Sequence, residues 1–241
     1  MKFFIEGNIG SGKTTLMDYL NSQQSYKDFK IKTLKEPVEE WKQFTDKETG
    51  QNILDYFYKD SKRWGYLFQM NAFITRSKLI DKYKHNNIIL MERSVYSDRF
   101  VFAKNCYEKG LIKSIEWDTY INWFEWLSNM LELNGDAYIY LRTSPEKSYE
   151  RIKKRDREEE TDISFEYIKE IHNKHEEWLN KQQDNILILD GNIENSKERL
   201  ENFAEQILNF IKTLLKNKYI KIDDCVSLDD GIKYVIEGQM V

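Results

Sequence analysis

The chain has 241 residues and a formal net charge of −4, so it offers no broad cationic surface for a nucleic acid polymer. Its 10 glycines and 2 prolines exclude collagen-like and Pro/Gly-rich disordered chains. Its 6 Trp, 15 Tyr and 13 Phe residues supply enough apolar surface to predict a folded chain with a sizeable core.

Short apolar runs of strand length alternate along the chain with long amphipathic stretches. The runs are residues 3–5, 31–34, 88–91, 137–141 and 186–189, and each is bounded by polar or turn residues. The stretches with helical spacing are 62–84, 117–133, 145–154, 165–180 and 197–215. This alternation predicts an α/β protein whose parallel sheet is covered by helices on both faces.

One domain is expected from residue 1 to 217. Residues 218–241 contain two short β-prone runs, 219–222 and 232–236, and we expect a C-terminal appendage of unknown role there.

No apolar run is long enough to span a bilayer, and no signal or transit peptide is seen, so we expect a cytoplasmic protein without membrane contact. Two cysteines, Cys106 and Cys225, are too few for a disulfide framework or a four-cysteine zinc site.

Residues 7–14, GNIGSGKT, fit the phosphate-binding pattern G-x-x-x-x-G-K-[ST] between a predicted strand and a predicted helix. In this pattern backbone N–H groups and the helix start surround phosphate oxygens, the lysine reaches the β/γ-phosphates, and the hydroxyl binds Mg²⁺. We therefore predict binding of ATP or a related nucleotide with Mg²⁺. The residues expected to bind it are Gly7, Asn8, Ile9, Gly10, Ser11, Gly12, Lys13, Thr14 and Thr15.

Charged residues follow the second and third predicted strands. Ligands of parallel α/β sheets bind beyond the carboxyl ends of the strands, so Glu36 is placed to face the phosphate loop and to accept a proton from an attacking hydroxyl. A solvated loop position explains Glu36 equally well. Glu92 is a candidate ligand for Mg²⁺ with Thr14, and Arg93 offers a cation to the acceptor oxygen or to Glu36. Asp98 and Phe102, four residues apart, would share one helix face.

Five cations lie within residues 151–157. A solvated helix face is the usual meaning of such a run. In a protein with a phosphate loop, the same run is typical of a mobile lid that covers the γ-phosphate.

Together these motifs resemble those of the deoxynucleoside kinase family, in the same order over about residues 1–190. The resemblance implies the fold of the kinases with a phosphate loop (P-loop), with a five-stranded parallel sheet of order 2-3-1-4-5. It implies phosphate transfer from ATP to the 5′-hydroxyl of a deoxynucleoside. It also implies a homodimer formed by two exposed helices, to which the aromatic-rich residues 117–127 are candidate contributors.

The resemblance assigns roles at the reacting end of the nucleoside. Glu36, in the E-P-V-x-x-W pattern, would be the general base on the 5′-hydroxyl, and Trp41 of the same pattern would line the pocket for sugar and base. Arg93 would contact the region of the 5′-oxygen. Tyr58 and Glu160 would bind the 3′-hydroxyl. The lid arginines that would bind phosphate are Arg151, Arg155 and Arg157.

The resemblance also names residues around the base. Gln69, after Phe68, would bind the base edge through its amide, and Phe102 would stack on the base. Arg76 and Asp98 match a charged pair of family members that prefer cytidine or purines, where thymidine-preferring members have small or apolar residues. We therefore expect deoxycytidine, deoxyadenosine or deoxyguanosine to be preferred over thymidine.

Two alternatives stay open at this stage. A nucleoside monophosphate kinase of the thymidylate kinase type shares the phosphate loop, but its acceptor phosphate needs dedicated cations. A non-enzymatic nucleotide-binding switch would not need Glu36, Gln69 and Glu160 at matching positions. Release of ADP that depends on a nucleoside separates this switch from both enzymes.

Overall fold

The computed structural model describes residues 1–156, 160, 163–181, 185–194 and 196–225. Five parallel strands form one sheet in the order β2-β3-β1-β4-β5, which confirms the predicted fold class and strand order. The strands are β1 (Lys2–Glu6), β2 (Ile31–Leu34), β3 (Ile88–Glu92), β4 (Ala137–Arg142) and β5 (Ile186–Asp190). Each starts and ends within about a residue of the apolar run that predicted it.

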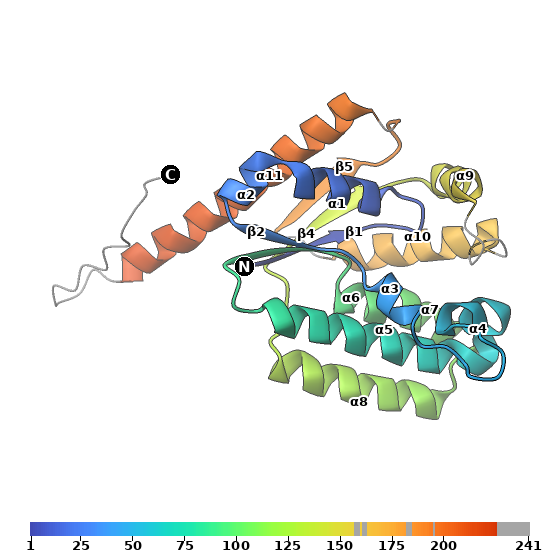
Figure 1. Ribbon diagram of the computed structural model, residues 1–241. Coiled ribbons are helices and arrows are strands. Elements are labelled where there is room, and N and C mark those ends of the chain that lie inside the picture. The colour runs from blue at the N-terminus through green and yellow to red at the C-terminus, as the bar shows by residue number, and fades with distance from the viewer. Residues whose placement is uncertain (157–159, 161–162, 182–184, 195, 226–241) are drawn as a thin grey trace.

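The sheet is buried because helices cover both of its faces (Figure 1). One face carries α1 (Lys13–Ser22), α2 (Gln24–Asp28) and α11 (Lys197–Cys225). Below the other face lie α5 (Ser61–Tyr83), α8 (Ser114–Met130) and α10 (Phe165–Leu179). Side chains of β1 alternate between the two cores: Phe3 and Ile5 pack with α1 and α11, whereas Phe4 packs on the opposite side.

Shorter helices surround the carboxyl ends of the strands. They are α3 (Val38–Trp41), α4 (Ile53–Lys59), α6 (Val95–Ser97), the π-helix η1 (Asp98–Ala103), α7 (Lys104–Glu108) and α9 (Pro145–Arg155). In the parallel register Ile5 pairs with Glu92, Glu6 with Tyr140 and Leu34 with Met91. The loops that follow β1, β2 and β3 therefore open at the same edge of the sheet.

The C-terminal helix extends further than its sequence predicts. Residues 219–222, expected to be β-prone, lie within α11, so that expectation is wrong. The helix continues because no glycine or proline interrupts residues 197–225, and its apolar residues recur at helical spacing through Ile207 and Ile211. The expected boundary at 217 falls inside this helix and stays a prediction, and residues 232–236 lie outside the described residues. None of the described helices combines the length and the apolar composition that crossing a membrane requires.

Candidate active site

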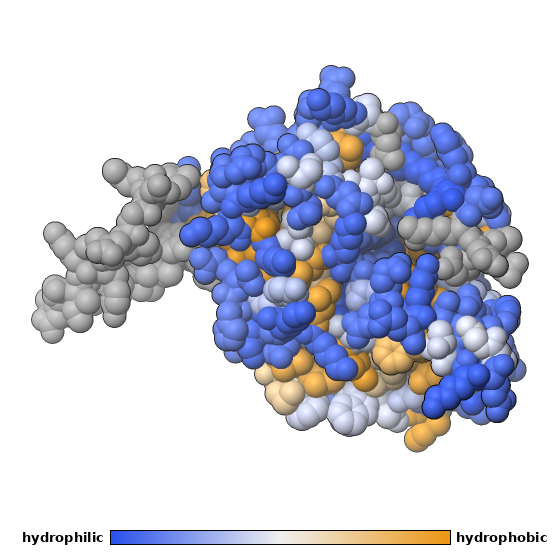
Figure 2. Space-filling view, viewed as in Figure 1, coloured by the Kyte–Doolittle hydropathy of each residue, from blue (hydrophilic) through white to orange (hydrophobic). Residues whose placement is uncertain are grey.

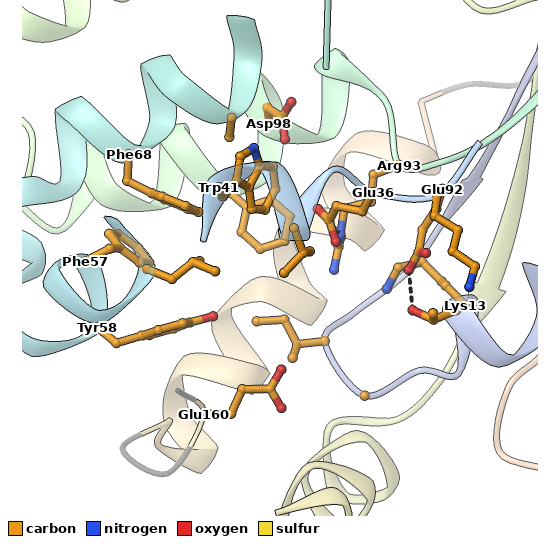
Figure 3. A pocket seen from close by; sticks show the side chains of 18 of the residues that line it. Lys13, Glu36, Trp41, Phe57, Tyr58, Phe68, Glu92, Arg93, Asp98 and Glu160 are labelled. Atoms are coloured by element: carbon orange, nitrogen blue, oxygen red, sulfur yellow. Dashed lines mark hydrogen bonds and ion pairs between the residues drawn. The ribbon is translucent and has the colours of Figure 1, made fainter. Parts of the chain in front are cut away.

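A cavity of about 400 Å³ opens at the carboxyl edge of the sheet, between the phosphate loop and helices α3, α4 and α5. In Figure 3 aromatic side chains line one end of it, and Lys13, Glu92, Arg93 and Glu36 gather at the other. Most of the predicted site residues line this cavity. They are Ile9, Gly10, Gly12, Lys13, Thr14, Thr15, Glu36, Trp41, Tyr58, Phe68, Gln69, Glu92, Arg93, Asp98, Phe102, Arg155 and Glu160.

Two glycines of the phosphate loop have no room for a side chain. A Cβ at Gly7 would lie 2.7 Å from the carbonyl oxygen of Leu141, and one at Gly10 would lie 2.3 Å from that of Ser148. Both have positive φ, at 152° and 75°. The loop is therefore packed directly on the end of β4 and on α9, which fixes the direction of its N–H groups.

Lys13 is folded back over the loop. Its Nζ donates to the carbonyl oxygens of Gly7, at 3.1 Å, and Asn8, at 2.7 Å. Burial, together with the charge of Arg93, lowers the pKa of Lys13 to about 7. Asn8 itself ties the loop to α10, because its side-chain amide donates to the carbonyl oxygen of Ile168 at 2.8 Å.

Thr14 and Glu92, the predicted ligands of Mg²⁺, are adjacent. The Thr14 hydroxyl donates to Glu92 Oε1 at 2.8 Å, shown by the dashed line in Figure 3. Glu92 ends β3 and is buried. A hydroxyl and a carboxylate are hard oxygen ligands, so this pair fits a Mg²⁺ ion.

Glu36 is held by two arginines. Its Oε1 accepts a hydrogen bond from Arg76 Nη2 at 2.8 Å and lies 3.4 Å from Arg93 Nε. Burial alone would raise the pKa of Glu36, but the charges of Arg93 and Arg76 hold it below its usual value. The side chain keeps 19% of its surface exposed, toward the cavity. Glu36 is thus an ionised carboxylate facing the phosphate loop, which excludes the solvated loop position that its sequence left open.

Arg76 joins Glu36 to Asp98. Its side chain is fully buried, with Nε 2.7 Å from Asp98 Oδ2 and Nη2 3.1 Å from Asp98 Oδ1. Its Nη1 donates to the carbonyl oxygen of Glu92 at 3.1 Å. Asp98 lines the cavity and Arg76 lies behind it. The sequence predicts the Arg76–Asp98 pair, whereas the contact with Glu36 has no signal in the sequence.

Arg93 leaves β3 in a left-handed backbone conformation, with φ of 62°. Its Nη1 donates to the carbonyl oxygen of Gly7 at 2.9 Å, and its guanidinium lies 4.6 Å from the centre of the Phe102 ring. Arg93 therefore contacts the phosphate loop, the Glu36 carboxylate and an aromatic wall of the cavity.

Aromatic rings form the end of the cavity far from the phosphate loop. Trp41 packs edge-on against Phe68 at 5.5 Å, and its indole N–H donates to Thr75 Oγ1 at 2.7 Å. Phe57 stacks on Phe68 at 4.6 Å and also lines the cavity. Phe57 is a cavity residue that the sequence did not predict, and its only signal there is that it is adjacent to Tyr58.

The polar groups of this end come from α5 and η1. Gln69 is buried, and its side-chain Nε2 lies 4.0 Å from Cys106 Sγ. Asp98 and Phe102 both line the cavity, as their spacing suggests, but from a π-helix rather than an α-helix. The hydrogen bonds of a π-helix span one residue more than those of an α-helix, and such turns are common at functional sites.

Of the predicted lid arginines, one lines the cavity and another binds backbone carbonyl oxygens away from it. Arg155 lines the cavity and donates to Glu160 Oε1 at 2.6 Å. Arg151, predicted to bind phosphate, instead donates from Nη1 to the carbonyl oxygens of Ser11 at 3.2 Å and Gly191 at 2.8 Å. The structure thus does not bring Arg151 to the cavity surface, because backbone carbonyls take up its guanidinium. Arg157 lies outside the described residues.

Comparisons with known proteins match the chain to one family over most of its length. The family model described as "Deoxynucleoside kinase" matches residues 3–212. A probable deoxycytidine kinase of fowlpox virus is 36% identical over 224 residues, which cover 88% of this chain and 89% of that protein. Mouse deoxycytidine kinase is 35% identical over 88% of this chain and 92% of its own length. Human mitochondrial thymidine kinase 2 is 37% identical over 73% of this chain and 63% of its own length.

Proposed function

The chain belongs to the deoxynucleoside kinase family and is a nucleoside kinase that uses ATP as phosphate donor, and we propose that deoxycytidine or a purine deoxynucleoside is its preferred acceptor. The observation that carries the proposed mechanism is the position of Glu36. Its carboxylate lies between the phosphate loop and the aromatic end of the cavity, where the 5′-hydroxyl of a nucleoside must reach the γ-phosphate.

In the proposed reaction Glu36 accepts the proton of the 5′-hydroxyl. Its lowered pKa keeps it ionised at neutral pH, which is the form that accepts a proton. Arg93 stabilises the charge that develops between the acceptor oxygen and the phosphate. Lys13 and the N–H groups of the loop hold the transferred phosphate in line with that oxygen.

Thr14 and Glu92 would hold Mg²⁺, which neutralises phosphate charge when it is bound. Of the lid arginines that the structure describes, Arg155 lines the cavity and is the proposed contact of the γ-phosphate. Tyr58 and Glu160 lie on the same side of the cavity in Figure 3 and are the proposed partners of the sugar 3′-hydroxyl.

The acceptor end supports a neutral nucleoside. Trp41, Phe57 and Phe68 surround it with rings, and Gln69 supplies both a donor and an acceptor for a base edge. An acceptor phosphate would instead need cations there, so the thymidylate kinase alternative is not favoured. The similar proteins include both deoxycytidine kinases and a thymidine kinase, so the proposed base preference rests on Asp98 and Arg76 alone.

The Asp98 carboxylate fills space beside the base and remains paired with Arg76. Burial raises the pKa of Asp98, against the opposing charge of Arg76. An amino group on cytosine or a purine can bond to this carboxylate. Thymine offers this carboxylate no donor there, and its 5-methyl group would lie against the buried charged pair.

The test is coupled ADP release with ATP, Mg²⁺ and each of the four deoxynucleosides, with thymidylate as a fifth acceptor. We expect turnover with deoxycytidine or a purine deoxynucleoside, and at least tenfold less with thymidine. Turnover with thymidine alone would overturn the base preference. Turnover with thymidylate alone, or with no acceptor, would overturn the proposed acceptor site.

We further propose a homodimer formed through α5 and α8. Exposed apolar side chains at Ile115, Trp123, Trp126 and Met130 lie on α8, and Leu67 is exposed on α5. Hydrophobic and neutral side chains gather along the lower edge of Figure 2, where these two helices lie. Apolar patches of this kind mark protein interfaces.

Sedimentation of Trp126→Glu tests the dimer. A charge in the centre of the interface should convert a dimer to a monomer at micromolar concentration. The matched control is Ile188→Glu, because Ile188 on β5 is 51% exposed and Trp126 is 53% exposed. A monomeric parent protein, or equal dissociation of both variants, would contradict the proposed interface.

A further inference from the structure

Glu6, the last residue of β1, is a buried carboxyl that the mechanism above does not use. Its side chain is fully buried immediately before the phosphate loop. Its Oε1 accepts the backbone N–H of Ser94 at 2.8 Å, while its Oε2 has no hydrogen-bond partner among the described residues. Burying a carboxyl with one oxygen unpaired is costly, so its position calls for a compensating role.

The hydrogen bond from Ser94 fixes the backbone just after Arg93. The N–H of Arg93 donates to the carbonyl oxygen of Ile5 at 2.9 Å. Arg93 is therefore held on both sides by β1, through the main chain of Ile5 and the side chain of Glu6. Between these two anchors its φ is 62°, a left-handed conformation that is unfavourable for a residue with a Cβ.

The direction of the Arg93 side chain depends on this backbone conformation. From it the guanidinium reaches the Gly7 carbonyl oxygen at 2.9 Å and lies 3.4 Å from the Glu36 carboxylate. If the peptide between Arg93 and Ser94 rotated, the guanidinium would move away from both. Two acceptors oppose this rotation: the Ser94 N–H donates to Glu6 Oε1 at 2.8 Å and, at the longer distance of 3.3 Å, to Ser97 Oγ. The shorter bond is the one to Glu6.

Glu6 serves as an acceptor of a hydrogen bond more than as a charge. Burial raises its pKa to about 7, against hydrogen bonding by Ser94 and the charges of Arg93 and Arg76. In a large fraction of the molecules the Glu6 carboxyl is therefore protonated near neutral pH. A carboxyl accepts the Ser94 N–H in either protonation state.

We propose that Glu6 is a positioning residue of the phosphate transfer, which holds the Arg93 backbone in the left-handed conformation that aims its guanidinium at the acceptor oxygen. This inference rests on the proposed function, because it requires Arg93 to act on the reacting oxygen. In this proposal Glu6 acts through the position of its side-chain oxygen Oε1, which reaches the Ser94 N–H, and not through its negative charge.

Two conservative variants separate reach from charge. Glu6→Gln keeps an oxygen at the same distance from Ser94 but loses the charge, so we expect kcat within about threefold of the parent. Glu6→Asp keeps the charge but withdraws the oxygen by one methylene, so we expect kcat to fall at least tenfold with a smaller change in the nucleoside KM. The opposite order, with the Asp variant active and the Gln variant impaired, would overturn the proposal.

A double-mutant cycle with Arg93→Lys tests whether Glu6 acts through Arg93. If it does, adding Glu6→Asp to Arg93→Lys should lower kcat less than twofold further, since the group it aims is already gone. Losses that multiply would mean that Glu6 acts elsewhere, and would overturn the inference.

The control for a general loss of stability is Glu176→Gln. Glu176 accepts hydrogen bonds from Tyr140 at 2.7 Å and Arg142 at 2.9 Å, outside the cavity lining. Its kcat should equal that of the parent even where its melting temperature falls as far as that of Glu6→Asp. Absence of turnover in the parent protein with every deoxynucleoside would overturn the proposed function. An active parent with an unaffected Glu6→Asp variant would overturn only the inference about Glu6.

Discussion

The two ends of the cavity are built from different kinds of atoms. The phosphate end comes from one continuous stretch, residues 7–15, whose backbone N–H groups and Lys13 are the predicted contacts of the phosphates. The acceptor end collects side chains from α3, α4, α5, η1 and the lid. A site of backbone atoms tolerates many side chains but no change of backbone path, whereas a site of side chains tolerates few substitutions. Variants at each end should therefore fail in different ways.

Glu36→Gln should have the largest effect, at the acceptor end. It removes the group that takes the proton, so kcat should fall by about 10²–10⁴-fold. The phosphate loop is unchanged, so ATP affinity measured by calorimetry should stay within about threefold. A kcat close to that of the parent would show that Glu36 is not the base.

Gly10→Ala should break the phosphate end. The new Cβ would lie 2.3 Å from the Ser148 carbonyl oxygen at a φ of 75°, so the loop must shift away from α9. Strain of this kind costs on the order of 1–3 kcal/mol. If it destabilises the loop conformation that binds ATP by this amount, the affinity for ATP falls by about five- to 150-fold. Calorimetry with ATP measures it.

The matched control for this change is Gly50→Ala. Gly50 has a similar φ of 71°, but a Cβ there would meet nothing within 4 Å. It therefore carries the backbone strain without the collision. Equal ATP affinities of the two variants would contradict the close packing of the phosphate loop on α9.

Asp98→Ala and Arg76→Met should separate base choice from rate. We expect Asp98→Ala to raise the ratio of thymidine to deoxycytidine kcat/KM by about tenfold, since the polar group that rejects thymine is gone. Arg76→Met should also lower kcat with every base, because Arg76 donates to Glu36 at 2.8 Å. Steady-state kinetics with both nucleosides measures the two effects.

Replacing both residues with small apolar side chains should raise thymidine use at a reduced overall rate. An unchanged preference in the double variant would remove the argument for base choice. An Arg76→Met variant with full kcat would show that Arg93 alone suffices to hold Glu36.

The pH dependence of stability gives the smallest expected effect. The pKa of Glu6 is raised from 4.5 to about 7 in the folded protein, so between these values the folded state binds more protons than the unfolded state. The contribution of Glu6 to the free energy of unfolding is thus fully present below pH 4.5 and is lost as pH rises through 7. Subtracting urea-denaturation curves of Glu6→Gln from those of the parent isolates it. A difference that does not vary with pH would contradict the raised pKa.

The two ends of the cavity also differ in how well the sequence predicts them. The phosphate end is predictable because its residues are consecutive and each has a local reason: glycine for the backbone path, lysine and threonine for the ligand. At the acceptor end, residues such as Gln69 and Glu160 come only from the resemblance, since nothing local marks a glutamine in an amphipathic helix. The structure brings them to one cavity, and their roles stay predictions.

Contacts between segments that are far apart along the chain could not be predicted from the sequence. Arg76 and Glu36 are 40 residues apart, and their hydrogen bond requires the exact packing of α5 beneath the loop after β2. Phe57 was missed because its short helix, α4, carries too few turns to show a period. Arg151 has the right charge at the right spacing, but carbonyl oxygens of Ser11 and Gly191 take up its guanidinium.

The π-helix η1 makes chain length a constraint of its own. It carries Asp98 and Phe102 into the cavity and then continues directly into α7, where Cys106 packs behind Gln69. Deleting one residue between Asp98 and Phe102 would let this segment take the tighter α-helical winding, in which five residues turn about as far as six do in a π-helix, so the flanking helices α6 and α7 would keep their relative orientation. The carboxylate and the ring would then be three residues apart instead of four, and their spacing along the helix axis would shorten. A single-codon deletion there should therefore disturb how the base is held while it leaves the helices on either side in place.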